Sequence, residues 1–364
     1  MAAKANDETI TIVPFDPAGN EAILTEVHAA RFTGRDSAAK RKSYAPWLLS
    51  NPMEGSIYLA AYVDGAFASF LGFMAREVVG FGRSFRGALA FGAMTLPQFA
   101  GRSLYRRLAH AGWEEVGRKG FDFALGYTVR QYVLDMEMRM GWGPMGAAPV
   151  MALPTDPAAI IRSTLPRLAA LAPLAAPAGY LAREWARWRA VRARTRACAI
   201  DPVTVFSPDL DGLNEAWRAA ERLTFAKDRR TLDWLYLSPY NPFDYDILEA
   251  RDGNDLIGFA VGRRMDLRGL DGYGILDLMA LPGRDDVLAP LAGRIVEIAL
   301  RTRPQLVAAL VSREGAANAA LRTVGFVNSR QAFSLIFKVT ADQLPAAVGE
   351  PGNWAHFWGN NDTV

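Results

Sequence analysis

Short apolar runs alternate with polar turns over the first hundred residues, and their spacing predicts strands with one helix among them. Residues 9–15 predict a strand and residues 20–31 an amphipathic helix. Residues 56–79 predict a β-hairpin, because two apolar runs flank Asp64-Gly65, the pair that a tight primed turn prefers. Residues 86–96 predict another strand, so the first part of the chain mixes helix and sheet.

The next stretch, residues 95–120, joins that strand to a long helix through a proline and a glycine-containing loop. The start of a helix leaves backbone N–H groups without partners and carries partial positive charge, so an anion such as a phosphate is its natural ligand. Residues 121–128 then predict a short buried strand, and residues 130–140 predict a helix that ends at Gly141.

A second mixed pattern follows a segment rich in Ala, Pro, Leu and Arg, residues 154–200. This second pattern predicts helices at 213–225, 287–302 and 315–326, and strands at 245–253, 256–265, 273–281 and 305–312. Both patterns run through a hairpin, a strand, a long helix, a strand and a short helix. The short helix closes at Gly141-Trp142 in one and at Gly325-Phe326 in the other, which indicates an internal duplication.

The repeated order predicts an α/β (α+β) fold built from two tandem domains, each a mixed sheet flanked by helices. The length of 364 residues agrees, because it exceeds the usual size of one hydrophobic core. We expect the first domain at residues 1–154, a linker at 155–200 and the second domain at 201–364.

Charge and composition narrow the classes of function. The net charge of +3 is small for this length and argues against a general nucleic-acid binder. A single cysteine, Cys198, excludes an internal disulfide, and only three histidines argue against a histidine-rich metal site. The amino-terminal residues lack the apolar core of a secretory signal, and no run of about 18 apolar residues predicts a spanning helix. We therefore expect a cytoplasmic protein without a bound metal.

The loop after residue 96 resembles the pyrophosphate loop of the GNAT acyltransferase superfamily, in its tandem two-domain form. That loop has Gln or Arg, two residues, Gly, one residue, then Gly or Ala. Gln98 and Gly101 match it, and Ser103 takes the place of the last small residue. The resemblance implies splayed sheets and a coenzyme A thioester as co-substrate. The residues implied to bind it are Thr95, Leu96, Gln98, Phe99, Ala100, Gly101, Arg102 and Ser103.

The second half departs from the family at the corresponding loop. Residues 282–287 read PGRDDV, which puts Asp285 and Asp286 where phosphates would lie. Like charges disfavour such a ligand. We therefore expect a GNAT-like second domain that binds no coenzyme A and that shapes the cleft for the acceptor.

Acyl transfer from a thioester to an amine requires a neutral amine, a polarised carbonyl and a proton for the departing thiolate. In the family a backbone N–H at the splay polarises the carbonyl, and Leu125, Gly126 and Tyr127 correspond to one side of that splay. The family often places a tyrosine four residues before the Gly-aromatic pair, where this chain has Glu137. The acid is therefore open between Tyr127 and Tyr132.

Candidates for the base are carboxylates whose pKa burial would raise, Glu137 or Asp135. His28 is a further candidate, because the first helix borders the acceptor site in this family. Each candidate has an ordinary structural alternative. Tyr127 ends a buried strand and fits the core, whereas Glu137 and His28 fit solvated helix surfaces.

Residues 178–197 carry an unusual combination of aromatic and basic side chains. Tyr180, Leu181, Trp185 and Trp188 recur at helical spacing, and six arginines surround them against the single acid Glu184. This pattern is typical of a helix lying on an anionic membrane. The alternative is a linker helix that packs its tryptophans between the domains, and nothing else in the chain supports nucleic-acid binding.

Together these observations predict an acyl-CoA-dependent N-acyltransferase, peripheral on the inner membrane. We expect a lipid amine acceptor such as a long-chain sphingoid base, in a role similar to that of the GNAT-like bacterial ceramide synthases. Small residues at Ala88, Ala90, Gly92 and Ala93 would leave room for an acyl chain or allow tight sheet packing. Residues 229–247 and 353–364 resemble segments of tandem GNAT-like proteins of envelope polysaccharide synthesis, so N-acetylation of an amino sugar is an alternative. A non-catalytic binding module is the third.

Overall fold

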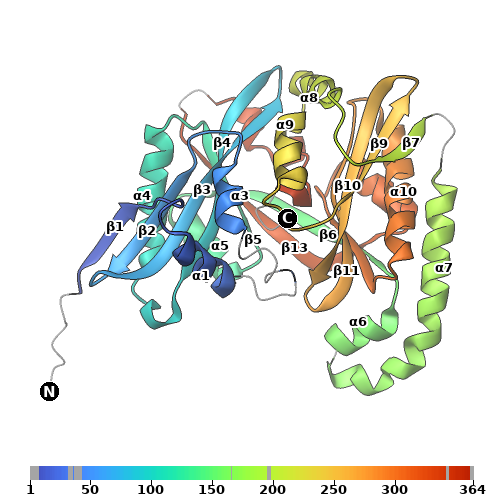
Figure 1. Cartoon of the computed structure of the whole chain (residues 1–364), viewed down its shortest axis with the longest axis horizontal. Helices are drawn as coiled ribbons and strands as arrows, with labels where there is room; N and C mark the ends of the chain where they lie inside the picture. The colour runs from blue at the N-terminus through green and yellow to red at the C-terminus, as the bar shows by residue number, and fades with distance from the viewer. Residues whose placement is uncertain are drawn as a thin grey trace.

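One continuous sheet connects two halves of similar architecture, which lie side by side (Figure 1). The computed structural model describes residues 8–31, 36, 43–164, 166–194, 198–341 and 344–360. Over these residues the sheet has 13 strands, in the order β1-β2-β3-β4-β5-β13-β6-β12-β11-β10-β9-β7, with β8 paired to β3. The predicted mixed α/β fold is confirmed.

The first half follows the predicted order of elements. It consists of β1 (Ile10–Pro14), α1 (Glu21–Arg31), α3 (Tyr44–Leu49), β2 (Ile57–Val63), β3 (Ala66–Gly80), β4 (Arg83–Thr95), the 3-10 turn η1 (Pro97–Phe99), α4 (Leu104–Arg118), β5 (Phe123–Thr128), α5 (Gln131–Arg139) and β6 (Gly143–Pro154). The hairpin turns at the predicted pair, because Asp64 and Gly65 have φ values of 50° and 81°. These positive angles are those of a primed turn, which matches the twist of the flanking strands.

The linker region is helical over most of its described residues. It consists of α6 (Pro157–Thr164), the 3-10 segment η2 (Pro166–Ala175) and α7 (Ala176–Arg192). Helix α7 runs along the outer edge of the second half, beside α10 (Figure 1). The prolines of this region sit at helix starts or within the 3-10 segment, where a missing N–H costs least.

The second half repeats the first. It consists of β7 (Ala199–Val203), α8 (Leu210–Ala219), β8 (Thr224–Phe225), α9 (Arg229–Leu232), η3 (Asp233–Leu237), β9 (Asp246–Asp252), β10 (Asp255–Leu267), β11 (Leu270–Ala280), η4 (Asp285–Val287), α10 (Leu288–Arg301), β12 (Leu306–Leu310), α11 (Ala316–Val324) and β13 (Val327–Val339). Three short turns end the described chain, η5 (Ala346–Gly349), η6 (Pro351–Asn353) and η7 (Trp358–Asn360).

The prediction of a helix over residues 213–225 is wrong at its end, because α8 stops at Ala219. Ala220 is extended, and Thr224 and Phe225 instead pair with Val79 and Val78 of β3. Both are fully buried between the halves, so their apolar character belongs to a strand and not to a helix face.

The two halves exchange their last strands. β6 leaves the first half and pairs with β12 of the second, whereas β13 returns from the second half and pairs with β5 of the first. β6 and β13 pair with each other at the centre of the sheet. The boundary expected at residue 154 therefore follows the order of the chain but does not separate two independent sheets.

Each half contains a pair of parallel strands that separate. β4 pairs with β5 only over Gly87–Leu89 and Phe123–Leu125, after which the two strands diverge. β11 pairs with β12 only from Gly272 to Ile275, and β11 continues to Ala280 without it. Where two neighbouring strands diverge, their backbone N–H and C=O groups no longer pair with each other and space opens between them. We call this opening a splay, and each half contains one.

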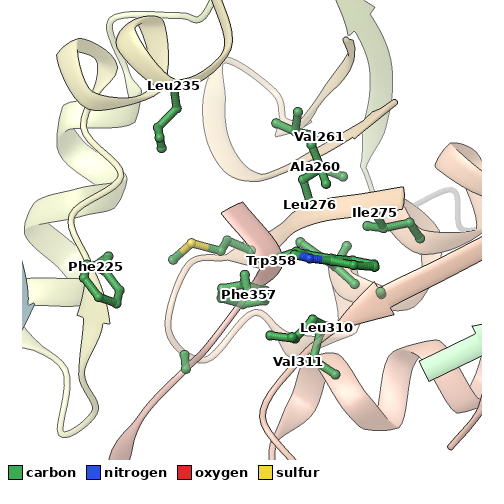
Figure 2. Packing of buried hydrophobic residues seen from close by; sticks show 14 of the residues in the cluster. Phe225, Leu235, Ala260, Val261, Ile275, Leu276, Leu310, Val311, Phe357 and Trp358 are labelled. Carbon is green, nitrogen blue, oxygen red and sulfur yellow. The ribbon is translucent and has the colours of Figure 1, made fainter. Parts of the chain in front are cut away.

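The end of the described chain enters the second splay. Residues 354–360, here called the tail segment, lie in the middle of the molecule between the halves (Figure 1). Phe357 forms a β-bridge with Val311, and Trp358 lies among Leu276 of β11 and Leu310 of β12 (Figure 2). The tail segment therefore fills apolar space that the diverging strands leave open.

Candidate active site

The loop between β4 and α4 has the geometry of an anion site. Gly101 has φ 84° and Ser103 has φ 56°, two left-handed residues that reverse the chain immediately before the helix. No side chain caps α4 and its first turn contains no acid, so its first N–H groups remain available to a ligand. Backbone amides at such a start, together with the helix dipole, favour a phosphate.

Arg102 holds this loop in place. Its guanidinium forms a bidentate ion pair with Glu8, at 2.7 and 2.9 Å, and donates to the carbonyl of Gln98 at 2.9 Å. Its Cζ also lies 5.5 Å from the ring centre of Phe99. The charge of Arg102 is thus paired, and the loop amides rather than this side chain are the free donors. The residues present fit the diphosphate of coenzyme A, which they would bind through backbone N–H groups.

The corresponding loop of the second half has the opposite electrostatics. Asp285 and Asp286 directly precede α10, and the Arg284 side chain donates to both Asp286 and Asp252. A cavity beside this loop is lined by Asp285 and Glu314, along with Arg222. Asp286 is paired with Arg284, yet carboxylates at a helix start disfavour a phosphate, so this loop is less suited to an anion than the loop before α4.

Tyr127 lies where β5 has already left β4, on the face of the sheet that looks toward the second half. Its hydroxyl is 2.9 Å from Nδ1 of His356, a residue of the tail segment. Burial raises the pKa of Tyr127 above its ordinary value, although the positive charge of Arg76 opposes the shift. The phenol therefore keeps its proton at neutral pH.

His356 is held by contacts on three sides. Its ring stacks on Trp354 with centroids 5.2 Å apart, its backbone N–H donates to Ser312 Oγ, and its carbonyl accepts from the Ser312 N–H. Burial lowers its pKa to about 3, so the imidazole is neutral. In the tautomer with the proton on Nδ1, His356 donates to the Tyr127 oxygen, which frees the phenolic proton for another acceptor.

A buried charge cluster lies next to this pair. Lys227 Nζ contacts both carboxylate oxygens of Asp277, at 2.7 and 2.8 Å, and the Tyr236 hydroxyl donates to the same carboxylate. Burial lowers the pKa of Lys227 to about 8, against the attraction of Asp277. A Cβ added at Gly359 would lie 2.5 Å from Asp277 Oδ2, so the tail segment passes directly over the cluster.

Arg76 brings a second cation to this region and is only 3% exposed. Its Cζ lies 5.0 Å from the ring centre of Phe225 and 5.6 Å from that of Trp234. Burial lowers its pKa, whereas the charge of Asp277 raises it. Asp228 acts on the pKa of Arg76 in the same direction, so two cations and two carboxylates share this region. A cation close to Tyr127 would stabilise a thiolate or an oxyanion formed there.

The structure buries Glu137, so the expected solvated surface is wrong for this residue. Glu137 is 2% exposed, accepts a hydrogen bond from the Tyr105 hydroxyl and has its Oε2 without a hydrogen bond. Burial raises its pKa, which Tyr105 and the charge of Lys338 partly offset. Its partner Tyr105 belongs to α4, on the face of the sheet opposite Tyr127, and a role as base stays a prediction.

His28 is also buried and not on a helix surface, because α1 packs this face against α3, where His28 lies 4.9 Å from the ring of Tyr44. Tyr132 is 62% exposed, and its hydroxyl accepts a hydrogen bond from Arg130. Asp135 accepts from Gln131 on an exposed helix face. Of the tyrosines considered as acids, only Tyr127 reaches the splay.

At Gly92, one of the small residues of β4, tight packing explains why the side chain is small. Gly92 has φ 68° and lies in a bulge opposite β3, and a Cβ there would be 2.7 Å from the Phe70 ring. Ala88 is fully buried. A bulge locally increases the twist of a strand, and this one follows the point at which β4 leaves β5.

Sequence reasoning missed the partners of Tyr127. His356, Lys227 and Asp277 come from three segments of the second half, the nearest of them a hundred residues beyond Tyr127. The one available signal was the aromatic, apolar character of residues 354–358, which indicates burial.

Comparison with known proteins addresses the fold. No protein-family model and no curated protein matches the sequence. Among solved structures, a GCN5-related N-acetyltransferase from Anabaena variabilis matches with a TM-score of 0.61 at 12% identity, covering 92% of this chain and 73% of that one. A tandem GNAT protein from the clavulanic acid biosynthesis pathway matches with a TM-score of 0.58 at 9% identity, covering 92% and 100%. The chain has a tandem GNAT fold.

A third similar structure is the N-myristoyltransferase of Saccharomyces cerevisiae with bound myristoyl-CoA. It matches with a TM-score of 0.60 at 10% identity, covering 92% of this chain and 84% of that one. At such identities the similarity establishes the tandem GNAT fold and leaves the chemistry to be argued from the residues. In the described part of this chain, no group of His, Cys, Asp or Glu is arranged to hold a metal ion, and no helix is long and apolar enough to cross a membrane.

Proposed function

We propose that the protein is an acyl-CoA-dependent N-acyltransferase whose first half binds the thioester. The observation that carries this proposal is the combination, in one half, of an uncapped helix start with a splayed strand pair. Gly101 and Ser103 shape the loop, α4 supplies the amides, and β4 and β5 diverge just beyond it. A diphosphate at the loop would direct the pantetheine arm and its thioester into the splay.

The acceptor amine enters from the face that carries Tyr127. The amine nitrogen forms a bond to the thioester carbonyl carbon, the carbon–sulfur bond breaks, and one proton leaves nitrogen while one reaches sulfur. Tyr127, protonated at neutral pH, gives its proton to the departing sulfur and recovers one from the amine nitrogen. His356 fixes the direction of the phenol, and Arg76 with Lys227 stabilises the negative charge.

The acceptor is a lipid amine such as a long-chain base, and the donor is a long-chain acyl-CoA. Supporting this choice, the exposed helix α7 presents tryptophan and leucine side chains to solvent, as expected of a protein that meets its substrate at a bilayer. The fold is also compatible with a long acyl chain, because the similar yeast structure contains myristoyl-CoA.

Calorimetry with acetyl-CoA and palmitoyl-CoA, with detergent controls to separate site binding from micelles, tests the donor. We expect saturable palmitoyl-CoA binding at least about tenfold tighter than acetyl-CoA binding, because an apolar chain adds buried area. Mass spectrometry should then detect a palmitoyl amide of sphinganine and none of glucosamine. Equal binding of the two thioesters would instead favour amino-sugar acetylation, and binding of neither would favour a non-catalytic module.

A further inference from the structure

Exposed apolar side chains gather on the segment from η2 to α7. Leu174 is 80% exposed and Trp188 is 53% exposed, and the others are Leu171, Tyr180, Leu181, Trp185 and Val191. Single exposed apolar residues are ordinary on a protein surface, whereas several within one short segment mark a site of interaction. The segment lies far from the tail segment, at the outer edge of the second half (Figure 1).

Helix geometry places the largest of these side chains on one outward face. At about 100° per residue, Leu181, Trp185 and Trp188 fall within roughly 60° of one another. The opposite face carries Gly179, Ala186 and Ala190, which are buried. Trp188 therefore points away from the molecule and Trp185 is 46% exposed, so neither tryptophan is buried between the domains.

The buried face holds α7 firmly in this orientation. α7 packs against α10 so closely that a Cβ added at Gly293 would lie 2.7 Å from the carbonyl oxygen of Ala190. One edge of Trp185 rests on Gly325, where an added Cβ would lie 2.6 Å from its ring. The outward face is thus preformed and loses little conformational entropy on binding.

The charge around this face is strongly positive. Residues 157–194 contain seven arginines and a single acid, Glu184. The Cζ atoms of Arg189 and Arg192 lie 5.7 and 5.5 Å from the rings of Trp185 and Trp188, so the guanidinium groups border the aromatic side chains. Arg187 pairs with Glu184 and Arg194 pairs with Glu297 of α10, whereas no carboxylate of the described residues pairs with Arg192.

We propose that the face formed by η2 and α7, with Leu174, Leu181, Trp185 and Trp188 at its centre, docks on an anionic phospholipid surface. The rings and leucines enter the boundary between headgroups and acyl chains, and the bordering arginines meet lipid phosphates. A second copy of this chain fits less well, because a two-fold contact would bring the same arginines of both copies together.

The test measures binding of the full-length protein to vesicles. Neither coenzyme A nor an acceptor is present, so the result does not depend on the proposed enzymatic activity. Sedimentation compares vesicles of phosphatidylcholine with vesicles containing roughly one third phosphatidylglycerol. We expect partitioning at least about tenfold stronger on the anionic vesicles, weakened by high salt, and a blue shift of tryptophan fluorescence on binding.

Matched variants locate the surface. Leu181→Glu combined with Trp188→Glu changes two exposed side chains and should reduce partitioning at least about tenfold while leaving the thermal unfolding midpoint unchanged. Val205→Glu places one such charge at an exposed apolar residue outside this face and should leave partitioning unchanged, whereas Leu181→Glu alone should not. The proposal is overturned if the wild-type protein shows no preference for anionic vesicles, or if the double variant partitions as strongly as wild type. It is also overturned if ultracentrifugation shows a wild-type dimer that the double variant does not form.

Discussion

The two splays of this molecule share a backbone design and differ in what occupies them. In the first half the strands open beside an uncapped helix start with two left-handed residues and no acid. In the second half they open beside Asp285 and Asp286, and the chain's own tail segment lies between them. A duplicated fold can thus keep one ligand site and convert the other into an internal packing site, with few changes to the topology.

The largest effect expected from this comparison concerns the two loop glycines. Gly101 and Gly283 have φ values of 84° and 86°, and a Cβ at either meets no atom within 4 Å. Gly101→Glu places bulk and negative charge at the proposed phosphate site, so palmitoyl-CoA affinity measured by calorimetry should fall at least about 1,000-fold, or about 4 kcal/mol.

Gly283→Glu is the matched control, because it introduces the same strain and charge in the second loop. Its palmitoyl-CoA affinity should equal that of wild type. Equal affinities for both variants would remove the first loop as the binding site, and a loss confined to Gly283→Glu would transfer the site to the second half.

The next effect concerns the stability that the tail segment supplies. Trp358 is buried among apolar residues of the second splay (Figure 2), so Trp358→Ala should lower the free energy of unfolding by about 3–5 kcal/mol through the cavity it leaves. Urea denaturation measures this loss. Trp188→Ala removes an exposed tryptophan and should change stability by about 0.5 kcal/mol or less, and similar losses in both variants would contradict the filled splay.

Tyr127 and Tyr132 provide a comparison of two tyrosines near the first splay. Tyr127→Phe deletes the hydroxyl bonded to His356 and should lower the turnover rate about 100-fold without changing the dissociation constant for palmitoyl-CoA. Tyr132→Phe deletes an exposed hydroxyl and should leave the rate unchanged. Steady-state kinetics measures the turnover rate and calorimetry measures the dissociation constant. A Tyr127→Phe enzyme with the wild-type turnover rate would exclude the phenol as the acid.

The smallest effect is a dependence of stability on pH. The pKa of His356 is about 3 in the folded protein and 6.5 in the unfolded chain, so only the unfolded chain binds a proton between these values. The free energy of unfolding therefore falls as pH falls through this window, by about 1.4 kcal/mol per pH unit for this group.

Urea denaturation at two pH values inside the window measures this slope. His356→Asn lacks the titrating ring, so from pH 6.5 to 5 wild type should lose about 1.6 kcal/mol more than the variant. Identical slopes would show that the folded protein admits a proton at His356 and that the ring is not sealed beneath Trp354.

The sequence predicts those features that depend on neighbours in the chain. The turn at Asp64-Gly65, the loop before α4 and the helix end at Gly141 follow from local backbone preferences, and each is confirmed by a positive φ. The parallel pairing of β4 with β5 is consistent with the strand–helix–strand order between them.

Features that depend on distant contacts could not be predicted. Tyr127 and His356 are 229 positions apart, and nothing in either local pattern indicates their hydrogen bond. Phe225 reads as the end of a helix because its apolar spacing continues that of α8, although burial between the halves selects a strand. The charged neighbours of Glu137 suggest a surface residue, and the packing of α5 against β5 and β13, with Tyr105 of α4 beside it, buries it.

The exchange of β6 and β13 has a consequence for how the protein is made. β5 is complete by residue 128, yet its partner β13 begins only at Val327. At a synthesis rate of about 5–20 residues per second, the first half waits roughly 10–40 s on the ribosome with an unprotected sheet edge. An unpaired strand edge can pair with another chain, so we expect the nascent first half to be prone to association until β13 has been translated.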